Sequence, residues 1–209
     1  MAGKAPDLHA AYQLSSPDDS RRLYAQWAKD YDSGFVTSED YQLHLHTARA
    51  FVEAGGAGPV LDVGAGTGIC GVALADLGVS PIDATDISAE MLDQAKAKGV
   101  YRAVIQADLT KRVPIADGTY SGIVSSGTFT TGHVGPDAFD ELLRVAAPGA
   151  QFALSINAKH FSAAGFEAKL TALAGQIAAL TLPETRIYGA EANGPHQDDT
   201  AFVALFRKA

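Results

Sequence analysis

The sequence predicts an α/β protein built on a doubly wound, mainly parallel sheet of seven strands whose C-terminal strand is antiparallel. From residue 59 onward, short apolar runs typical of buried strands alternate with amphipathic runs of helical period. This alternation is typical of βαβ units, which place helices on both faces of a parallel sheet. The last two β runs, at 185–190 and 201–208, are joined by a loop without a crossover helix. We therefore expect them to form an antiparallel hairpin at one edge of the sheet.

Two helices are expected before the first strand. Residues 16–19, Ser-Pro-Asp-Asp, supply an N-cap, a proline at the first helical position and acids that face the helix dipole. The first helix should run to about residue 31, and Thr37 or Ser38 should cap the second, which ends at Gly55-Gly56. Three aromatic residues share one face of the first helix at positions i, i+3 and i+7: Tyr24, Trp27 and Tyr31.

The remaining elements are predicted from the change between the strand period of two residues and the helix period of about 3.6 residues. They are a strand at 59–63, a helix at 68–77, a strand at 81–85, a helix at 88–98, strands at 102–107 and 120–126, a helix at 136–146, a strand at 150–156 and a helix at 165–180. In such a sheet the ligand binds at the carboxyl ends of the strands.

Size and composition narrow the class of protein. A chain of 209 residues predicts a single domain, 1–209, and no apolar stretch approaches the roughly 20 residues that span a membrane. The N-terminus lacks the apolar segment of a signal peptide, so we expect a cytoplasmic protein. Net charge −8 disfavours nucleic acid as a partner, and the single cysteine, Cys70, excludes an internal disulfide. We expect no metal site.

The most informative feature is a glycine-rich turn. The buried-strand pattern 60–63 is followed by glycines at alternate positions, Gly64, Gly66 and Gly68, and then by a helix. Glycines so placed allow a tight turn and a close approach of the backbone to a ligand. Residues 66–71 also satisfy the G-x-G-x-x-G pattern of dinucleotide-binding folds, with Asp86 about 20 residues further on, where it would bind a ribose. That pattern alone is weak evidence.

Three features favour a nucleoside ligand without a pyrophosphate. Asp62 lies inside the first strand, where it would face the cationic end of a ligand rather than a phosphate. The alternate spacing of the glycines is the second feature. The third is Asp108, which ends a strand as Asp86 does. Two acids at neighbouring strand ends can accept hydrogen bonds from ribose hydroxyls and an exocyclic amine.

On these residues the chain resembles the class I S-adenosylmethionine-dependent methyltransferases. Residues 61–68, 85–92 and 106–109 are similar to the family's first three motifs, and 142–150 to the turn before its fifth strand, although the family more often has Gly-Gly where this chain has Gly149-Ala150. The resemblance implies a Rossmann-like methyltransferase fold and S-adenosylmethionine as cofactor. The cofactor-binding positions that it implies, together with the reading above, are Tyr24, Trp27, Asp62, Gly64, Gly66, Gly68, Asp86, Ile87, Met91, Asp108, Leu109 and Ser125.

Within that family, residues 24–32 and 126–134 are similar to the small methyltransferases related to the Williams-Beuren syndrome chromosome-region protein. Residues 16–56 are then expected to form an N-terminal helical lid over the cofactor. His133 follows the fourth strand, where an acceptor would meet the methyl group, and is the candidate general base. Its alternative role is to hold the loop by hydrogen bonds.

The expected activity is transfer of a methyl group from S-adenosylmethionine to a small-molecule acceptor by direct displacement. A non-catalytic cofactor-binding partner protein remains an alternative, because the binding motifs would survive loss of the chemistry. An NAD(P)-dependent oxidoreductase is a further alternative, and Asp62 is the feature that counts most against it.

Overall fold

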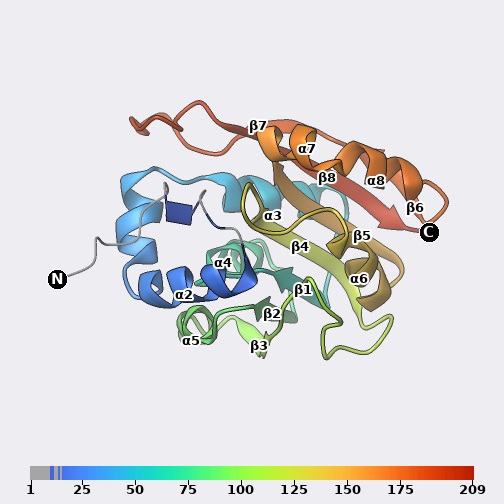
Figure 1. Cartoon of the computed structure of the whole chain (residues 1–209). Coiled ribbons are helices and arrows are strands. Elements are labelled where there is room, and N and C mark those ends of the chain that lie inside the picture. Colours follow the sequence, from blue (N-terminus) through green and yellow to red (C-terminus); the bar gives the residue numbers. More distant parts are fainter. Residues whose placement is uncertain (1–9, 12–13, 15) are drawn as a thin grey trace.

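The computed structural model describes residues 10–11, 14 and 16–209 (Figure 1). Its strands lie in one sheet in the order β3-β2-β1-β4-β5-β8-β6, and β7 pairs with β8 beside β6. The strands are β1 (Val60–Val63), β2 (Ile82–Asp86), β3 (Tyr101–Gln106), β4 (Tyr120–Phe129), β5 (Ala146–Asn157), β6 (Ile177–Thr181), β7 (Glu184–Arg186) and β8 (Thr200–Lys208). The helices are α2 (Pro17–Trp27), the π-helix η1 (Tyr31–Val36), α3 (Leu43–Glu53), α4 (Ile69–Asp76), α5 (Ala89–Ala97), α6 (Ala138–Val145), α7 (Ala158–Ala164) and α8 (Phe166–Ala172).

The strand directions confirm the predicted sheet. Strands β1 to β5 pair in parallel, whereas β8 is antiparallel to β5. Strands β6 and β7 pair with opposite ends of β8, both antiparallel, so they share the edge position and the sheet is seven positions wide. The order reverses between β1 and β4, which is where ligands bind in open α/β sheets.

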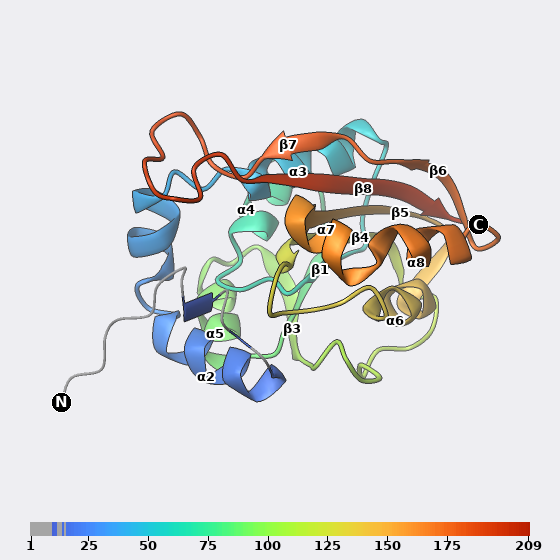
Figure 2. The ribbon, with the colours of Figure 1, turned by 45° about the horizontal axis from the view of Figure 1, so that its top comes forward.

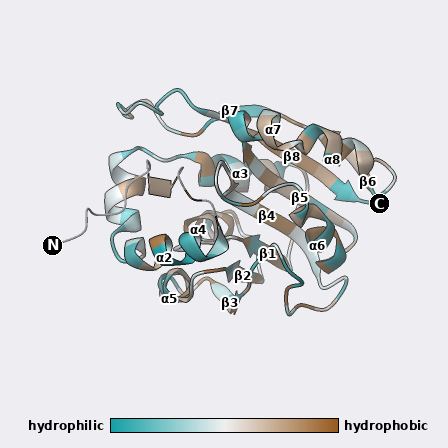
Figure 3. Ribbon diagram, viewed as in Figure 1, coloured by the Kyte–Doolittle hydropathy of each residue, from teal (hydrophilic) through white to brown (hydrophobic). Residues whose placement is uncertain are grey.

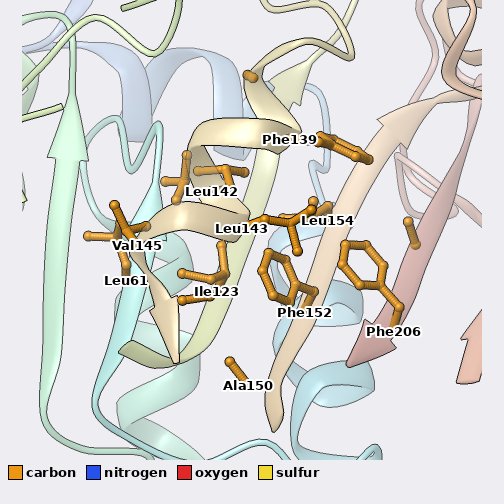
Figure 4. Packing of buried hydrophobic residues seen from close by; sticks show 14 of the residues in the cluster. Leu61, Ile123, Phe139, Leu142, Leu143, Val145, Ala150, Phe152, Leu154 and Phe206 are labelled. Atoms are coloured by element: carbon orange, nitrogen blue, oxygen red, sulfur yellow. The ribbon is translucent and has the colours of Figure 1, made fainter. Parts of the chain in front are cut away.

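The sheet is covered by helices on both faces, as predicted (Figure 2). Leu61 of β1 faces α6, where it packs with Leu142 and Ile123, whereas its neighbour Val60 packs with Phe51 of α3 on the opposite face. Figure 4 shows the first of these layers, in which the side chains of α6 meet those of β1, β4, β5 and β8. Hydrophobic residues accordingly colour β4 and β5 in the middle of the sheet (Figure 3). Burial on both faces explains why these strands read as nearly continuous apolar runs.

The N-terminal helices differ from their predicted bounds. The first ends at Trp27, and the chain continues into η1, while the second begins at Leu43 rather than near residue 38. The backbone N–H groups of Gln42 and Leu43 both donate to the Ile187 carbonyl, at 2.9 and 3.2 Å. This tertiary contact holds the segment before α3 against the chain beyond β7, so the sequence between residues 38 and 42 does not join the helix.

The predicted helix over 165–180 is wrong in its second half. Helix α8 ends at Ala172, and the segment 177–181 is β6, which pairs with β8. Helix α7 was not predicted; Asn157 caps it by accepting from the N–H groups of Lys159 and His160, and Gly165 ends it at φ +82°. None of the helices among the residues described combines the length and the hydrophobicity that a membrane span requires.

Candidate functional site

A cavity lies at the carboxyl ends of β1, β2, β3 and β4, beneath α2. Its floor is the glycine turn after β1, its side is formed by the ends of β2 and β3, and Tyr24 of α2 lies across it. It encloses about 950 Å³ of empty space, counting the part that opens to solvent.

The three glycines of the turn serve different purposes. All have positive φ, at +63° for Gly64, +56° for Gly66 and +88° for Gly68. A Cβ on Gly64 would lie 2.0 Å from Thr128 Oγ1, and one on Gly68 would lie 3.0 Å from Ala95, so these two allow close packing behind the turn. A Cβ on Gly66 would meet no atom within 4 Å. Since Gly66 lines the cavity, it keeps open the space that a ligand would use.

Asp86 holds the turn from the end of β2. Its Oδ2 accepts from the Gly66 N–H and its Oδ1 from the Ser88 N–H, both at 2.9 Å. Burial raises the pKa of this carboxyl, although the two amide hydrogen bonds and that of Ile87 act in the opposite direction. Asp86 and Gly66 both line the cavity, and each carboxylate oxygen has a further lone pair with which it can accept from a ligand.

Asp108 lines the same cavity from the end of β3. Its Oδ1 accepts from the N–H of Thr110 at 2.9 Å and from the hydroxyl of Thr110 at 2.6 Å. Its Oδ2 lies 3.0 Å from Lys111 Nζ. Burial raises the pKa of Asp108, but these contacts outweigh it and the pKa is lowered. The two predicted strand-end acids are thus brought to one cavity.

Asp62 does not reach the cavity. The side chain is fully buried on the α4 side of β1, and its Oδ2 accepts from the Tyr101 hydroxyl at 2.6 Å. Burial raises the pKa of Asp62 to about 7. The expectation that this carboxylate faces the ligand directly is therefore wrong. Side chains alternate between the two faces of β1, and Asp62 lies on the face that α4 covers. Ser125 is also behind the cavity, where its hydroxyl donates to the Val63 carbonyl at 2.8 Å.

Apolar side chains complete the cavity on the β2 and β3 side. Ile87, Met91 and Leu109, three of the predicted contacts, all line it. Trp27 does not; it is 7% exposed and lines a second cavity, which adjoins the first. Sequence reasoning missed Tyr41, which lines both cavities and carries no local pattern that would have singled it out. Tyr31, the third residue of the predicted aromatic face, also lines both cavities.

His133 is hydrogen-bonded to Tyr24 across the mouth of the cavity. Its Nε2 lies 2.7 Å from Tyr24 Oη, and its Nδ1 lies 3.0 Å from the Thr131 carbonyl. A carbonyl only accepts, so Nδ1 carries the proton and Nε2 of the neutral ring accepts from the tyrosine. Burial lowers the pKa of His133, as does the nearby His160. The sequence-predicted candidate base is therefore neutral at pH 7 and has a basic nitrogen directed at Tyr24.

The charged side chains that line the cavity favour a nucleoside ligand over a dinucleotide. Among the described residues that line it, Asp86 and Asp108 are the charged side chains, and neither lysine nor arginine is present. The two carboxylates suit hydrogen-bond donors such as ribose hydroxyls and disfavour a pyrophosphate, and the nearby cation, Lys111, is paired with Asp108 without lining the cavity. Within residues 10–11, 14 and 16–209, no three His, Cys, Asp or Glu side chains gather as a metal site would require. The fold and site therefore define a Rossmann-like protein with a nucleoside-binding cavity.

Comparison with known proteins identifies the family. Residues 60–149 match the family model described as "Methyltransferase domain". The chain is 30% identical over 156 residues to human methyltransferase-like protein 27, covering 70% of this chain and 63% of that protein. It is 32% identical over 146 residues to the demethylmenaquinone methyltransferase of Beutenbergia cavernae, covering 66% and 58%. The chain thus spans under two thirds of the length of these relatives.

A solved structure agrees in fold. The N-methyltransferase NodS from Bradyrhizobium japonicum WM9, in complex with S-adenosyl-L-homocysteine, superposes with a TM-score of 0.65 at 16% identity, covering 90% of this chain and 98% of NodS. The chain belongs to the class I S-adenosylmethionine-dependent methyltransferases, and S-adenosylmethionine is the cofactor of this family. The open face of Gly66 and the two acids that line the cavity fit that sulfonium nucleoside.

Proposed function

We propose that the protein transfers a methyl group from S-adenosylmethionine to a small-molecule acceptor. The observation that carries this proposal is the pairing of Asp86 with the open, positive-φ Gly66 at the switch point of the sheet. Asp86 would accept from the ribose hydroxyls. The adenine would lie between Ile87, Met91 and Leu109, with Asp108 near its exocyclic amine.

The glycine turn would hold the methionine end of the cofactor, with Gly64 and Gly68 shaping the backbone from behind. Asp62 and Ser125 would support the turn without contacting the cofactor. Asp62 accepts a hydrogen bond from Tyr101, which packs on Gly68, and Ser125 donates one to the carbonyl of Val63 at the end of β1. Tyr24 would contact the cofactor from α2, and Trp27 would contact the acceptor instead. Residues 16–56 would act as the lid.

The cofactor supplies an already activated methyl group, so the protein requires no covalent nucleophile. Its residues would align the acceptor and exclude water, which is the main source of rate enhancement in such displacements. An acceptor hydroxyl that must lose its proton would pass it to Tyr24 Oη as the tyrosine proton passes to His133 Nε2. The resulting imidazolium would then lose its proton to solvent.

A small molecule is the acceptor class that the surroundings support best. Aromatic side chains of α2 and η1 surround the cavity mouth, and the chain carries net charge −8, which disfavours a nucleic-acid acceptor. The relative from Beutenbergia cavernae is a demethylmenaquinone methyltransferase, which agrees with a small-molecule acceptor. The expected location is the cytoplasm.

The residues that line the cavity favour a nucleoside over a dinucleotide. The purified chain should bind S-adenosylmethionine and S-adenosylhomocysteine, whereas NADH should not bind, because two carboxylates and no lysine or arginine are among the described residues that line the cavity, which disfavours its pyrophosphate. Isothermal titration calorimetry with the three ligands measures this directly. Saturable heat from NADH without heat from either sulfur nucleoside would contradict the proposed function.

A further inference from the structure

A second cavity adjoins the cofactor cavity and shares part of its wall. Tyr24, Tyr31, Tyr41, Gly127 and His133 line both cavities, so the two meet at the Tyr24–His133 hydrogen bond. The second cavity encloses about 530 Å³ of empty space, counting its opening. A molecule bound there would therefore place its nearest atom beside the Tyr24–His133 pair, next to the cofactor cavity.

Aromatic rings form most of this second cavity. Trp27 lies edge-to-face with Phe35 at 5.5 Å between ring centroids, and Phe35 contacts Tyr41 at 5.4 Å and Tyr188 at 6.5 Å. The rings come from α2, η1, the segment before α3 and the chain after β7, which the hydrogen bonds to Ile187 hold together. Tilted rings around an apolar space favour a planar aromatic ligand, which adds offset or edge-to-face contacts.

No charged side chain lines the second cavity among the described residues. A buried charge without a partner is costly, so an ammonium, carboxylate or phosphate group on the ligand would be excluded. Its polar side chains are neutral and include His133 and Asn157. Asn157 is 5% exposed, and its Oδ1 accepts from the N–H groups of Lys159 and His160. Its NH₂ group has no hydrogen-bond partner within the described chain and is available to a ligand oxygen.

We propose that this second cavity is the acceptor site and that it binds an uncharged aromatic molecule carrying a hydroxyl group. The hydroxyl lies at Tyr24 and His133, and an additional neutral oxygen of the ligand accepts from Asn157. The inference rests on the proposed methyl transfer but names its acceptor class. It can be tested apart from the cofactor site, because Trp27, Phe35, Tyr188 and Asn157 line the second cavity and not the first.

The sole tryptophan of the chain provides a direct test, since Trp27 lies in this cavity. Three phenols that share one ring and differ in the charge of the para substituent are titrated into the protein. The fluorescence emission of Trp27 is followed with and without S-adenosylhomocysteine. The phenols are 4-hydroxyphenylacetamide, which is neutral, 4-hydroxyphenylacetate, which is its anionic isostere, and tyramine, which is cationic. The amide should change the emission saturably and bind at least about tenfold more tightly than either charged phenol.

Variants separate the cavity from general effects on the fold. Trp27→Phe removes the emission signal and keeps an aromatic ring in the cavity wall, so calorimetry should still detect the amide, with weaker binding than in the wild type. Asn157→Asp keeps the oxygen that caps α7 but replaces the NH₂ donor with a charge, so preference should move about tenfold or more from the amide toward tyramine. Equal binding of the three phenols, or an unchanged preference in Asn157→Asp, would overturn the proposal.

Calorimetry with S-adenosylhomocysteine keeps the two proposals distinguishable. If the nucleoside binds and none of the phenols alters Trp27 emission, the acceptor site is wrong while the cofactor site stands. If the amide binds selectively and the nucleoside does not, the acceptor cavity is supported and the proposed function fails instead.

Discussion

Replacing His133 with asparagine is expected to reduce turnover about 100-fold on an acceptor that must lose a proton. The reason is the tautomer fixed by the Thr131 carbonyl, which leaves Nε2 as the basic atom and places it 2.7 Å from Tyr24 Oη. Affinity for S-adenosylmethionine should change little. Steady-state kinetics on the methylated acceptor, with calorimetry for the cofactor, measure both quantities.

The pH profile adds a second readout for His133. Burial holds its pKa below the usual value near 6.5, so the neutral, proton-accepting form already predominates at pH 7. The wild-type rate should therefore be level near neutral pH and fall as the pH is lowered through that depressed pKa. The groups that face the imidazole are Tyr24 of α2, which donates to it, and His160 of α7, whose charge would lower the pKa further.

Two control variants distinguish a base from a loop support. His160→Asn alters another histidine of the same region, whose Nε2 contacts the Val134 carbonyl at 3.1 Å, and should leave turnover nearly unchanged. Tyr24→Phe removes the relay hydroxyl and keeps the ring, so it should lower turnover without loss of stability. If His133→Asn retains full turnover, or loses only stability, the histidine does not take the proton.

The glycine turn and the strand-end acids could be predicted from the sequence because local pattern determines them. Strand β1 must be followed by residues that adopt positive φ, and only glycine does so at low cost, so Gly64, Gly66 and Gly68 mark the turn by themselves. Asp86 ends β2 for a similarly local reason, since its carboxylate caps the backbone of the following turn. Strand order then brings Asp86 and Asp108 together.

Features set by tertiary contacts were not predictable in this way. Residues 177–181 carry a pattern compatible with helix, and only pairing with β8 makes them a strand. The direction of the Asp62 side chain depends on the face of β1 that α4 covers and on the distant Tyr101. Tyr41 reaches the site because it pairs with Tyr188, about 150 residues further along the chain, which no local period reveals.

Replacing Asp86 with alanine is expected to weaken S-adenosylmethionine binding by about 1 to 3 kcal/mol, or roughly 5- to 150-fold. The carboxylate has two tasks, to fix the Gly66 N–H at 2.9 Å and, as proposed, to accept from the ribose hydroxyls. Calorimetry measures the loss. Asp83→Asn is the matched control, because Asp83 lies on the same strand and is bonded to Arg102 and Tyr120 away from the cavity. It should lower the free energy of unfolding and leave cofactor affinity intact.

A chemical double-mutant cycle separates the two tasks of Asp86. Adenosine and 2′,3′-dideoxyadenosine differ only in the ribose hydroxyls, so the difference in their affinities reports contacts to those hydroxyls. If Asp86 binds the ribose, the wild type should prefer adenosine and Asp86→Ala should lose most of that preference. If Asp86 only restrains Gly66, both nucleosides should weaken equally in the variant. That second result would place the ribose elsewhere, because a disordered glycine turn penalises every ligand of the cavity whether or not it carries hydroxyls.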